Sequence, residues 1–463
     1  MNDQDCKKAY SEQQDTLPAF HITGEKGWIN DPNGLVFFKG EYHVFFQYHP
    51  FSTVWGPMHW GHVVSADLTN WRYLPIALAP GGKGDKDGCF SGTAICAFGK
   101  LYLMYTGFEE NGGGDNIRQV QCLAESDDGV TFKKHGVVIG SDQLPEEYLP
   151  CDFRDPHVFC HDGKFYCLVA AKTKELKGRL LLYRSPDLFK WEFVGDTLGF
   201  DSEGIMFECP DFVEQFGMIA VCDQLPPPKE DGCLNVHSTR YFLGKMDFES
   251  GKFKVKSEGV LDYGFDYYAP QCFAGIDEKI FIGWLNMWDR NVPSAKYGFA
   301  GMLTVPRKMT VENGKVIQTP VVNKREVFKT SVDKNLTDKA VIGVIEIDAE
   351  GLESFELKLR AFGENFTSIK LENGFWKFDR SKSGEEIKGA EKDGLSRSGV
   401  RKMPFSGGKN TKITIVLDRY SVELFEGGNV MSSTIYPPEN ADKLALFIEA
   451  EKCVYTRYDV VKQ

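Results

Sequence analysis

Short runs of apolar and aromatic residues, separated by polar turns, fill the chain from about residue 20 to residue 310. Typical runs are residues 35–38 and 42–46, which are separated by the tripeptide Lys-Gly-Glu at 39–41. Runs of this length, bounded by glycine and charged residues, predict β-strands joined as hairpins. The N-terminal part of the chain is therefore expected to consist of antiparallel strands.

A motif of serine, aspartate and an aromatic residue recurs along these strands. Ser65-x-Asp67-x-x-x-Trp71 is followed by equivalent segments centred on Asp128 and Asp187, and by a weaker one at Asp247. The four aspartates lie 61, 59 and 60 residues apart. A period of about 60 residues filled with short strands indicates a β-propeller whose blades are longer than those of the commoner repeats.

A second series of residues keeps the same spacing. Asp31, Ser91, Asp155, Glu208 and Tyr268 lie 60, 64, 53 and 60 residues apart. Each is expected at an equivalent place on the innermost strand of its own blade, and the inner strands of a propeller surround one central funnel. Five positions imply five blades, so residues that are far apart in the sequence are expected to converge there.

The character of the sequence changes after residue 311. Residues 312–335 are polar and rich in lysine, which is typical of a connector. Later segments alternate apolar and polar residues as half-buried strands do: 341–347, 355–359, 413–417 and 421–425. Strands of this kind, with Gly, Asp and Asn turns, predict an antiparallel β-sandwich. We therefore expect an all-β protein with a five-bladed β-propeller over 18–311, a connector over 312–335 and a β-sandwich over 336–463.

Charge and cysteine content narrow the classes of partner and compartment. The net charge of −12 disfavours nucleic-acid and anionic-membrane partners, because both need clustered Lys and Arg. Residues 1–20 are polar and mixed in charge, without the apolar core of a signal peptide, so a cytoplasmic location is expected. The 12 cysteines are scattered and form no Cys-x-x-Cys pair, so they predict reduced thiols and no zinc site.

The segment at residues 28–34, Trp-Ile-Asn-Asp-Pro-Asn-Gly, combines a stiff turn with sugar-binding chemistry. Residues 31–34 alone have the composition of a type I turn. Trp28 and Asn30 supply an aromatic face that can stack on a sugar ring and an amide that can hold its hydroxyls. The heptad resembles the signature of glycoside hydrolase family 32, the β-fructofuranosidases, in which the residue matching Asp31 is the nucleophile.

Two further acids of the series lie in similarly stiff settings. Asp31 and Asp155 are each followed directly by proline, and Glu208 by Cys-Pro, and proline biases the preceding residue toward extended geometry. Arg154 is expected to keep its neighbour Asp155 ionised, which suits that acid to holding sugar hydroxyls. Glu208 has apolar neighbours in the sequence, which predicts a raised pKa and the role of proton donor.

The resemblance to family 32 implies the same division of roles. It makes Asp31 the nucleophile, Asp155 the stabiliser of the transition state and Glu208 the acid/base of a retaining, two-step hydrolysis. The carboxyls of Asp31 and Glu208 are then expected about 5–5.5 Å apart. The resemblance also implies a set of substrate-binding residues: Asn30, Gln47, Trp55, Trp60, Phe90, Ser91, Arg154, Asp266, Tyr268 and Trp284. It implies neither a metal nor an organic cofactor.

These features predict an enzyme that releases terminal, non-reducing β-D-fructofuranosyl units from sucrose, sucrose 6-phosphate or short fructo-oligosaccharides. One alternative is a fructosyltransferase, which passes the same covalent intermediate to a second sugar. Another is a non-catalytic fructan-binding propeller, which predicts a missing acid, whereas all three are present. The leaving group stays open, with Lys83, Lys86 and Arg118 as candidates for contacting a phosphate. The expected partner is a small saccharide, and the sandwich could serve as a homodimer interface.

Overall fold

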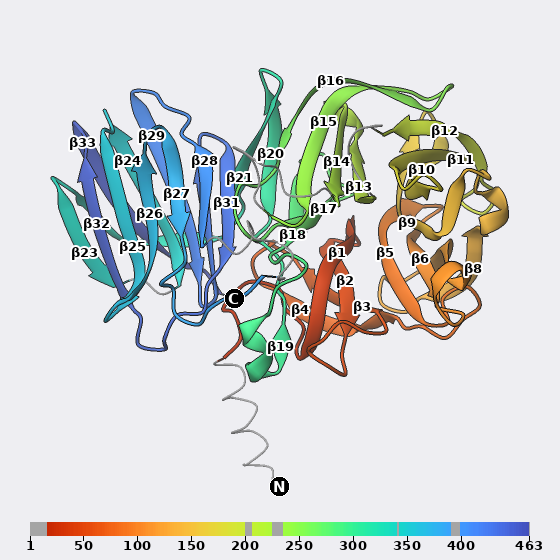
Figure 1. Ribbon diagram of the computed structural model, residues 1–463, viewed down its shortest axis with the longest axis horizontal. Helices are drawn as coiled ribbons and strands as arrows, with labels where there is room; N and C mark the ends of the chain where they lie inside the picture. Colours follow the sequence, from red (N-terminus) through yellow and green to blue (C-terminus); the bar gives the residue numbers. More distant parts are fainter. Residues whose placement is uncertain (1–15, 200–205, 225–234, 340–341, 390–398, 463) are drawn as a thin grey trace, which may run out of the picture.

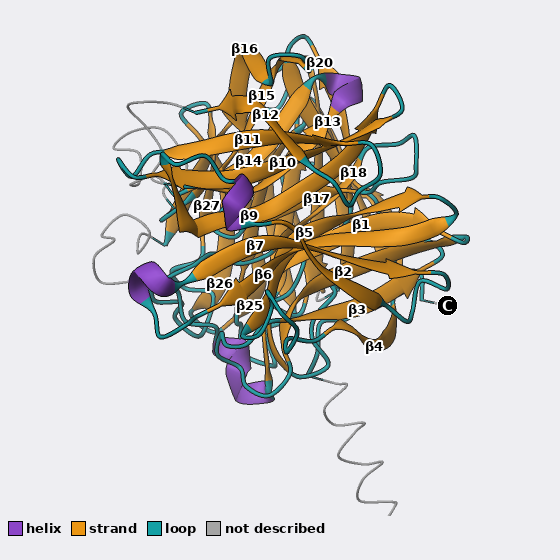
Figure 2. Cartoon of the chain, turned by 90° about the vertical axis from the view of Figure 1, so that its right-hand side faces the viewer, coloured by secondary structure: helices purple, strands orange, loops and turns teal. Residues whose placement is uncertain are grey.

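Strands make up nearly all of the regular structure. The computed structural model describes residues 16–199, 206–224, 235–339, 342–389 and 399–462. In these residues the helical elements are four short 3-10 turns: Gly114–Asn116, Ser141–Gln143, Glu214–Phe216 and Pro293–Tyr297. Figure 2 shows how small these turns are beside the strands. No helix of the described ranges is long and apolar enough to cross a membrane.

The first of two bodies is a five-bladed β-propeller, and each blade is built on four antiparallel strands that follow one another in chain order, with β19 between the second and third strands of the fifth blade (Figure 1). Blade one contains β1 (Gly27–Phe38), β2 (Glu41–His49), β3 (His59–Ser65) and β4 (Arg72–Leu78). Blade two contains β5 (Gly88–Ala97), β6 (Lys100–Glu109), β7 (Arg118–Ser126) and β8 (Lys133–Ile139). Blade three contains β9 (Tyr148–His161), β10 (Lys164–Thr173), β11 (Gly178–Ser185) and β12 (Glu192–Leu198). Blade four contains β13 (Phe207–Val213), β14 (Met218–Asp223), β15 (Ser238–Asp247) and β16 (Lys252–Val260). Blade five contains β17 (Tyr268–Cys272), β18 (Ile280–Trp284), β20 (Arg307–Glu312) and β21 (Lys315–Pro320).

The first strand of every blade lies at the centre of the propeller. Strands β1, β5, β9, β13 and β17 contact one another in a ring. The ring is reinforced where β19 (Phe299–Ala300), which follows β18, pairs in parallel with the start of β1. Because each blade begins at the centre, the five inner strands run in the same direction. Residues at equal heights on these strands therefore face one another across the axis.

The Ser-x-Asp repeat forms the turn between the third and fourth strands of a blade. In blade two, Asp128 Oδ1 accepts hydrogen bonds from the backbone N–H groups of Val130 and Thr131, both at 2.8 Å, and from the Ser126 hydroxyl at 2.9 Å. The Thr131 and Val130 amides lower the pKa of Asp128 to about 2. The equivalent turns of blades one, three and four are held by Asp67, Asp187 and Asp247. The repeat is thus an Asx-type turn, and the predicted five-bladed propeller is confirmed.

The second body is an antiparallel β-sandwich of two six-stranded sheets, as predicted. One sheet contains, in spatial order, β22 (Lys324–Ser331), β33 (Lys452–Val460), β24 (Gly343–Glu350), β29 (Asn410–Asp418), β30 (Ser421–Glu426) and β31 (Asn429–Thr434). The other contains β23 (Asn335–Lys339), β32 (Lys443–Glu449), β25 (Ser354–Phe362), β26 (Asn365–Glu372), β27 (Phe375–Asp379) and β28 (Val400–Pro404). The inner faces enclose one apolar core that includes Ile345, Trp376 and Leu424.

The segment expected to be a connector, residues 312–335, consists largely of strand. β21 pairs with β20 and completes the fifth blade. β22 pairs with β33 and forms the edge of a sandwich sheet. The chain therefore passes from propeller to sandwich within residues 321–323.

A buried network of charges joins the two bodies. Arg307, on β20, lies 2.9 Å from Asp262 of the propeller and 2.7 Å from Glu423 of the sandwich. His21 contacts Asp418 at 2.8 Å and Glu423 at 3.0 Å. Burial alone would lower the pKa of His21, but the two carboxylates raise it to about 9, so this histidine is cationic at neutral pH. Loss of one member would leave an uncompensated buried charge, which is strongly destabilising.

Candidate active site

A β-bulge interrupts the inner strand of every blade at a similar height. The pairing register shifts at 29–32 in β1, 89–92 in β5, 154–157 in β9, 208–211 in β13 and 268–271 in β17. A bulge bends the strand and re-aims the side chains beside it. All five residues of the predicted series lie at these bulges: Asp31, Ser91, Asp155, Glu208 and Tyr268.

Proline is tolerated at four of these bulges because a bulge interrupts the hydrogen-bonded ladder. The four are Pro32, Pro156, Pro210 and Pro270. The residues before the last three, Asp155, Cys209 and Ala269, have φ angles of 62°, 49° and 48°. Such left-handed backbone is uncommon outside glycine and costs on the order of 1–3 kcal/mol per residue. The recurring X-Pro pairs therefore mark backbone that departs from regular pairing where the candidate acids lie.

The protein contacts the carboxyl of Asp31 through one of its two oxygens. Oδ2 accepts a hydrogen bond from the Ser91 hydroxyl at 2.6 Å and lies 3.5 Å from the thiol sulfur of Cys209. Oδ1 has no hydrogen-bond partner among the described residues. A carboxylate fixed through one oxygen, with the other unpaired, is suited to act as a nucleophile.

Both oxygens of Glu208 are engaged. Arg154 Nη2 donates to Oε1 at 2.7 Å, and the Tyr268 hydroxyl donates a short hydrogen bond to Oε2. Arg154 is held in turn by Asp152 at 2.9 Å, and Lys172 donates to the same carboxylate at 2.8 Å. Glu208 of blade four is therefore linked to side chains from blades three and five.

The thiol of Cys209 connects Asp155 to Asp31. Asp155 Oδ2 accepts the backbone N–H of Cys209 at 3.0 Å and lies 3.6 Å from the same sulfur that contacts Asp31. Arg154 Nε is 3.9 Å from Asp155 Oδ2, a longer separation than the 2.7 Å between this arginine and Glu208. The three acids therefore form one cluster, in which Arg154 pairs most closely with Glu208.

The electrostatics of the three acids differ from those expected from their sequence neighbours. Burial raises the pKa of Asp31 to about 6, against the hydrogen bond from Ser91, and raises the pKa of Asp155 to about 7, against the charge of Arg154. Burial also acts to raise the pKa of Glu208, but Arg154 and the Tyr268 hydroxyl outweigh it, so this pKa lies below its usual value. Both pKa shifts therefore run opposite to the directions expected from the sequence. At Asp155, burial outweighs the charge of Arg154, and at Glu208, Arg154 and Tyr268 outweigh burial.

A cavity of about 590 Å³ contains the three acids. Nine residues predicted from the sequence line it: Asn30, Asp31, Gln47, Trp55, Phe90, Ser91, Arg154, Asp155 and Glu208. The side chain of Trp55 is 45% exposed, and its ring meets Phe90 edge-on with centroids 5.9 Å apart. The cavity therefore combines an aromatic wall with carboxyls and amides, and its size is within the range of small-molecule sites.

Three predicted substrate-binding residues lie behind the cavity wall rather than on it. Trp60 is fully buried, and its indole N–H donates to the backbone carbonyl of Phe90 at 3.0 Å. Tyr268 is buried and donates to Glu208. Trp284 is fully buried, with its ring 6.5 Å from that of Tyr268. These residues support the cavity-lining side chains and have no surface on the cavity.

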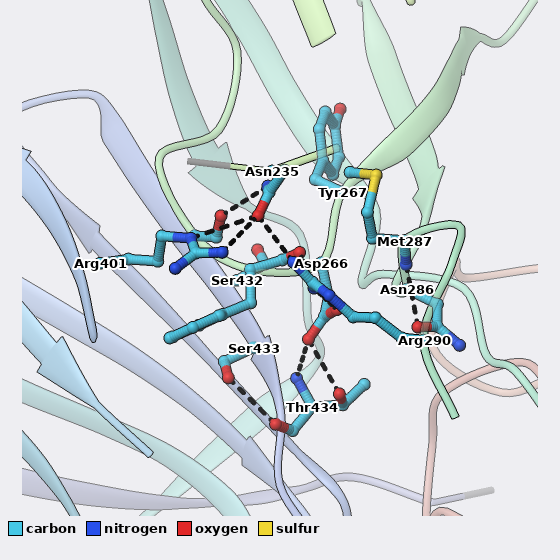
Figure 3. Close-up of polar contacts among 12 residues, drawn as sticks. Asn235, Asp266, Tyr267, Asn286, Met287, Arg290, Arg401, Ser432, Ser433 and Thr434 are labelled. Atoms are coloured by element: carbon cyan, nitrogen blue, oxygen red, sulfur yellow. Dashed lines mark hydrogen bonds and ion pairs between the residues drawn. The ribbon is translucent and has the colours of Figure 1, made fainter. Parts of the chain in front are cut away.

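Asp266, also predicted to bind substrate, belongs to the junction between the two bodies. Its carboxylate pairs with Arg290 at 2.8 Å and with Arg380 of the sandwich at 2.7 Å. It also accepts hydrogen bonds from the backbone N–H and the hydroxyl of Thr434 at 2.7 and 2.8 Å (Figure 3). Asp266 is fully buried and does not line the cavity, so the structure corrects its expected contact with substrate.

Six lining residues were not singled out from the sequence: Gln119, Asp152, Gln224, His237, Trp288 and Asp289. Asp152 lies two residues before Arg154 on β9, so the alternation of side chains along a strand was the signal that could have found it. Trp288 lies in the loop after β18, with its ring 6.3 Å from that of Trp28. No periodic pattern marks a loop residue, so Trp288 could not be found in this way.

The charged groups that line the cavity are mostly acidic. Five carboxyl groups line it, and Arg154 is the one permanently cationic side chain among its described lining residues. The candidates for contacting a phosphate, Lys83, Lys86 and Arg118, do not line it. Arg118 instead donates to the backbone carbonyls of Asp115 and Ile117 at 2.5 and 2.7 Å.

Known proteins are similar to this chain in both sequence and architecture. The family model for the glycosyl hydrolases family 32 N-terminal domain matches residues 21–320, and the model for the family 32 C-terminal domain matches residues 311–461. A sucrose-6-phosphate hydrolase from Zymomonas mobilis is 37% identical over 470 residues, which cover 93% of this chain and 89% of that protein. A raffinose invertase from Escherichia coli is 36% identical over 450 residues, which cover 93% and 91%.

Solved structures give the same result. The sucrose-6-phosphate hydrolase from Lactobacillus gasseri superposes with a TM-score of 0.87 at 26% identity, covering 98% of this chain and 96% of that one. A mutant of a family 32 β-fructofuranosidase from Bombyx mori, in complex with sucrose, superposes with a TM-score of 0.83 at 29% identity and covers 100% and 99%.

A five-bladed propeller joined to a β-sandwich, with three carboxyls clustered at the propeller axis, defines a glycoside hydrolase. The chain belongs to glycosyl hydrolase family 32. The expectation from the sequence, an enzyme of the β-fructofuranosidase family, is thereby confirmed.

Proposed function

We propose that the protein is a retaining β-fructofuranosidase that hydrolyses sucrose from its fructosyl end. Asp31 is the nucleophile, Glu208 the acid/base and Asp155 the stabiliser of the transition state. The observation that carries the proposal is the convergence of these three carboxyls in one cavity, with an unpaired oxygen on Asp31 and the Cys209 thiol in contact with both aspartates.

The reaction proceeds in two steps with balanced proton transfers. Asp31 Oδ1 attacks the anomeric C2 of the fructosyl unit while Glu208 gives its proton to the glycosidic oxygen, and the bond between C2 and that oxygen breaks. Glu208 then takes a proton from water, whose oxygen attacks C2 and releases the carboxylate of Asp31. The two inversions leave the configuration at C2 unchanged. Asp155 accepts hydrogen bonds from ring hydroxyls, and these contacts strengthen as positive charge develops on the ring.

The cavity walls support recognition of the fructosyl unit. The rings of Trp55 and Phe90 offer an apolar wall for the C–H groups of the sugar. The amides of Asn30 and Gln47 are oriented by the protein: Asn30 Oδ1 accepts the indole N–H of Trp28 at 2.9 Å, and Gln47 Nε2 donates to a backbone carbonyl at 3.1 Å. Amide groups that are already fixed can bind sugar hydroxyls without a further loss of side-chain freedom.

The stereochemistry of the first product tests this mechanism. We expect NMR of the early reaction to show β-fructofuranose before mutarotation, and mass spectrometry of the quenched Glu208→Gln variant, reacted with an aryl fructofuranoside, to find a fructosyl adduct on Asp31. The same reagent should leave Asp31→Asn unmodified. Early release of the α-anomer, or an adduct on another residue, would contradict the assignment.

The charges lining the cavity favour a neutral leaving group. Five carboxyls and a single arginine line the described walls, and that arginine is already paired, so a phosphate dianion would meet net repulsion. Sucrose 6-phosphate is the second candidate substrate, because relatives such as the Zymomonas mobilis protein are named sucrose-6-phosphate hydrolases.

The ratio of kcat/KM for sucrose 6-phosphate to that for sucrose separates the two candidates. A ratio at or below one is expected for the neutral substrate. A ratio well above one would assign the phosphorylated substrate and would require a phosphate-binding cation outside the described walls. A dominant series of oligosaccharides at high sucrose concentration would instead indicate fructosyl transfer.

We also propose that the protein works in the cytoplasm. All ten cysteines within the described ranges are free thiols, which is typical of proteins that remain in a reducing compartment. Fractionation of cells that express the native chain, with activity in the cytosolic fraction, is the expected result. Recovery of the activity in the culture medium would contradict it.

A further inference from the structure

A second cavity, of about 580 Å³, lies at the other end of the propeller axis. Strands β1, β5, β9 and β13 contribute residues to both cavities, and β17 contributes to the second. On β9, Asp155 lines the first cavity and His157 the second, and on β13 the same is true of Glu208 and Asp211. The two cavities share no lining residue, so the second is a separate feature of the same five-stranded ring.

A layer of hydrogen bonds closes the axis between the two cavities. The backbone N–H of Gly92 donates to Asn33 Oδ1 at 3.1 Å, and Gln271 Nε2 donates to the carbonyl of Gly92 at 2.9 Å. The Thr93 hydroxyl donates to the carbonyl of Pro156 at 3.0 Å. These bonds tie the inner strands of blades one, two, three and five together at mid-height. A ligand of the second cavity therefore enters from the face opposite the active site.

The second cavity is lined by buried polar groups that the described protein does not pair. Both ring nitrogens of His157, Asp211 Oδ1 and Gln271 Oε1 have no hydrogen-bond partner among the described residues. These residues are 8%, 1% and 2% exposed. An unsatisfied buried polar group costs about 1–3 kcal/mol, and native proteins contain few of them. Three such residues around one cavity therefore indicate a site built for a polar ligand.

The raised pKa of Asp211 is a second sign that its carboxyl is incompletely hydrogen-bonded. Its Oδ2 accepts the backbone N–H of Cys272 at 3.0 Å and lies 3.6 Å from His157 Nδ1. Burial raises the pKa of Asp211 above its usual value, against the influence of His157. A hydrogen-bond donor placed on Oδ1 would stabilise the carboxylate and offset this cost.

The lining residues narrow the chemical class of the ligand. The acids Asp211 and Glu214 line the cavity together with the cation Lys279. Lys279 donates to the backbone carbonyl of Ile276 at 3.3 Å and its charge acts on Asp211, so the charged groups leave no excess of positive charge to select an anion. No group of three or more His, Cys, Asp or Glu side chains in the described ranges is arranged to hold a metal ion. The unpaired oxygens of Asp211 and Gln271 can accept hydrogen bonds. The amide nitrogen of Gln271 already donates to the carbonyl of Gly92, so its oxygen is the atom left for a ligand. The side chains of Ile95 and Phe159 add apolar surface. A ligand with several hydroxyl donors and a C–H face satisfies all of these features.

We propose that this cavity binds a small neutral polyol, of the size of a monosaccharide or disaccharide. Its hydroxyls donate to Asp211 and Gln271 and bond to His157, and its C–H groups lie against Phe159. The site is independent of the proposed hydrolysis, because it shares no lining residue with the active-site cavity.

Two exposed thiols allow binding to be measured in the native chain. Cys96 and Cys160 line the second cavity and are exposed, whereas the partly buried Cys151 adjoins the active-site residue Asp152. We would follow the alkylation rate of each cysteine with iodoacetamide by mass spectrometry, in the presence of D-glucose, D-fructose or sorbitol. At a polyol concentration ten times Kd, the rates at Cys96 and Cys160 are expected to fall by about tenfold, since the unbound fraction is 1/(1 + [L]/Kd). With a polyol that does not inhibit hydrolysis, the rate at Cys151 should stay unchanged.

Two variants test whether the protection arises in the cavity. His157→Phe removes a buried hydrogen-bonding group from the cavity. Cys96→Trp places a large side chain at the exposed mouth of the cavity and leaves Cys160 as the reporter. In both variants the polyol should no longer protect Cys160 from alkylation. Phe98→Trp, an exposed neighbour outside the cavity, is the matched control and should keep the protection. Sucrose hydrolysis should continue in Cys96→Trp, which shows that the protein is folded and separates this test from that of the catalytic assignment.

Four outcomes would overturn the proposal. The first is no protection by any of the three polyols up to about 0.1 M, which would saturate a millimolar site. The second is protection that rises linearly and equally at Cys151, as a general solvent effect would. The third is protection by Mn²⁺ alone. The fourth is full protection of Cys160 in Cys96→Trp and in His157→Phe.

Discussion

The inner strands of the propeller and the strands of the sandwich use antiparallel pairing differently. In the sandwich, β24 pairs with β29 and with β33 without a shift of register, and β29, β30 and β31 continue the same regular ladder. Alternate side chains such as Ile345 and Ile347 enter the core. In the propeller, every inner strand is broken by a bulge, and the candidate acids lie at those breaks. Regular ladders build the core, and interrupted ones build the site.

A bulge alone does not make a site, as one in the sandwich shows. The pairing of β25 shifts between Leu359 and Phe362, where Arg360 has a φ of 52°. The guanidinium of Arg360 is used inside the protein, because it donates to the carbonyls of Ala441 and Arg419 at 2.7 and 3.0 Å. Asp31, by contrast, keeps an unpaired oxygen. The difference is whether the protein itself satisfies the re-aimed side chain or leaves part of it for a ligand.

The largest expected effect comes from removing an acid at a propeller bulge. Glu208→Gln keeps the volume of the side chain but takes away the proton that the leaving oxygen needs, so sucrose turnover should fall by on the order of 10²–10⁴. An aryl fructofuranoside, whose phenolate departs without a proton, should lose much less in the first step. Steady-state and burst kinetics on the two substrates measure this difference.

The same substitution on an outer strand serves as the control. Glu192→Gln on β12 removes an exposed ion pair with Arg184, in which the two charged groups lie 2.6 Å apart, and should leave turnover unchanged. Near-native sucrose turnover in Glu208→Gln would mean that another group supplies the proton.

The next effect is on stability rather than on catalysis. Trp376 is fully buried in the sandwich core, and its indole N–H donates to Glu426 at 2.9 Å. Trp376→Ala should lower the free energy of unfolding by about 3–5 kcal/mol through the lost contacts and the cavity left behind. At temperatures where the variant stays folded, its kcat/KM should match that of the native chain. Urea unfolding and sucrose kinetics on one preparation measure both quantities, and Trp376→Phe should give a smaller loss of stability.

A fall in kcat/KM as large as that of Glu208→Gln, in a folded Trp376→Ala protein, would contradict this separation. It would mean that the sandwich core acts on the acids through the junction. Arg380 and Asp266 are the pair through which such an effect would pass.

Much of the fold could be predicted because each blade repeats the same short turn motif, which is visible in the sequence. Each Ser-x-Asp turn needs an acceptor at one position to bind two backbone amides, so Asp67, Asp128 and Asp187 recur at the period of the blades. The role of residues 312–335 was harder to see, because β22 is an edge strand with mostly exposed residues. A polar edge strand and a polar linker have similar compositions, so the distinction needs the pairing partner.

The candidate acids could also be found from the sequence, whereas their electrostatics could not. Arg154 and Asp155 both line the cavity at the bulge of β9, but the guanidinium lies 2.7 Å from Glu208 on the next blade and 3.9 Å from Asp155. The burial of two tryptophans that were predicted to bind substrate could not be foreseen either. A tryptophan beside a candidate site can face it or support it, and the burial of Trp60 and Trp284 becomes visible once five blades are packed together. Contacts between blades are the information that local sequence lacks.

The smallest expected effect concerns the hydrogen bond that fixes Asp31. Turnover needs Asp31 ionised and Glu208 protonated. The pKa of Asp31, about 6, lies above that of Glu208. At a pH between the two pKa values, the pair of carboxyls therefore holds one proton. This proton is lost as the pH rises through about 6, so kcat/KM should fall there. Ser91→Ala removes the 2.6 Å bond that stabilises the ionised form, so it raises the pKa of Asp31 and moves this descending limb to higher pH.

The size and sign of this shift distinguish which acid carries the proton. A hydrogen bond to an ionised group contributes about 1.5–3 kcal/mol and a pKa unit corresponds to about 1.4 kcal/mol, so we expect a shift of about 1–2 units together with a lower maximum. Thr93→Val, two residues further along β5, is the control, because the Thr93 hydroxyl bonds to Pro156 and Val158. Asp155 titrates in all of these proteins, so the difference between their pH profiles of kcat/KM is the measurement. If the ascending limb moves to higher pH instead, the proton resides on Glu208, and Asp31 is the stronger acid of the pair.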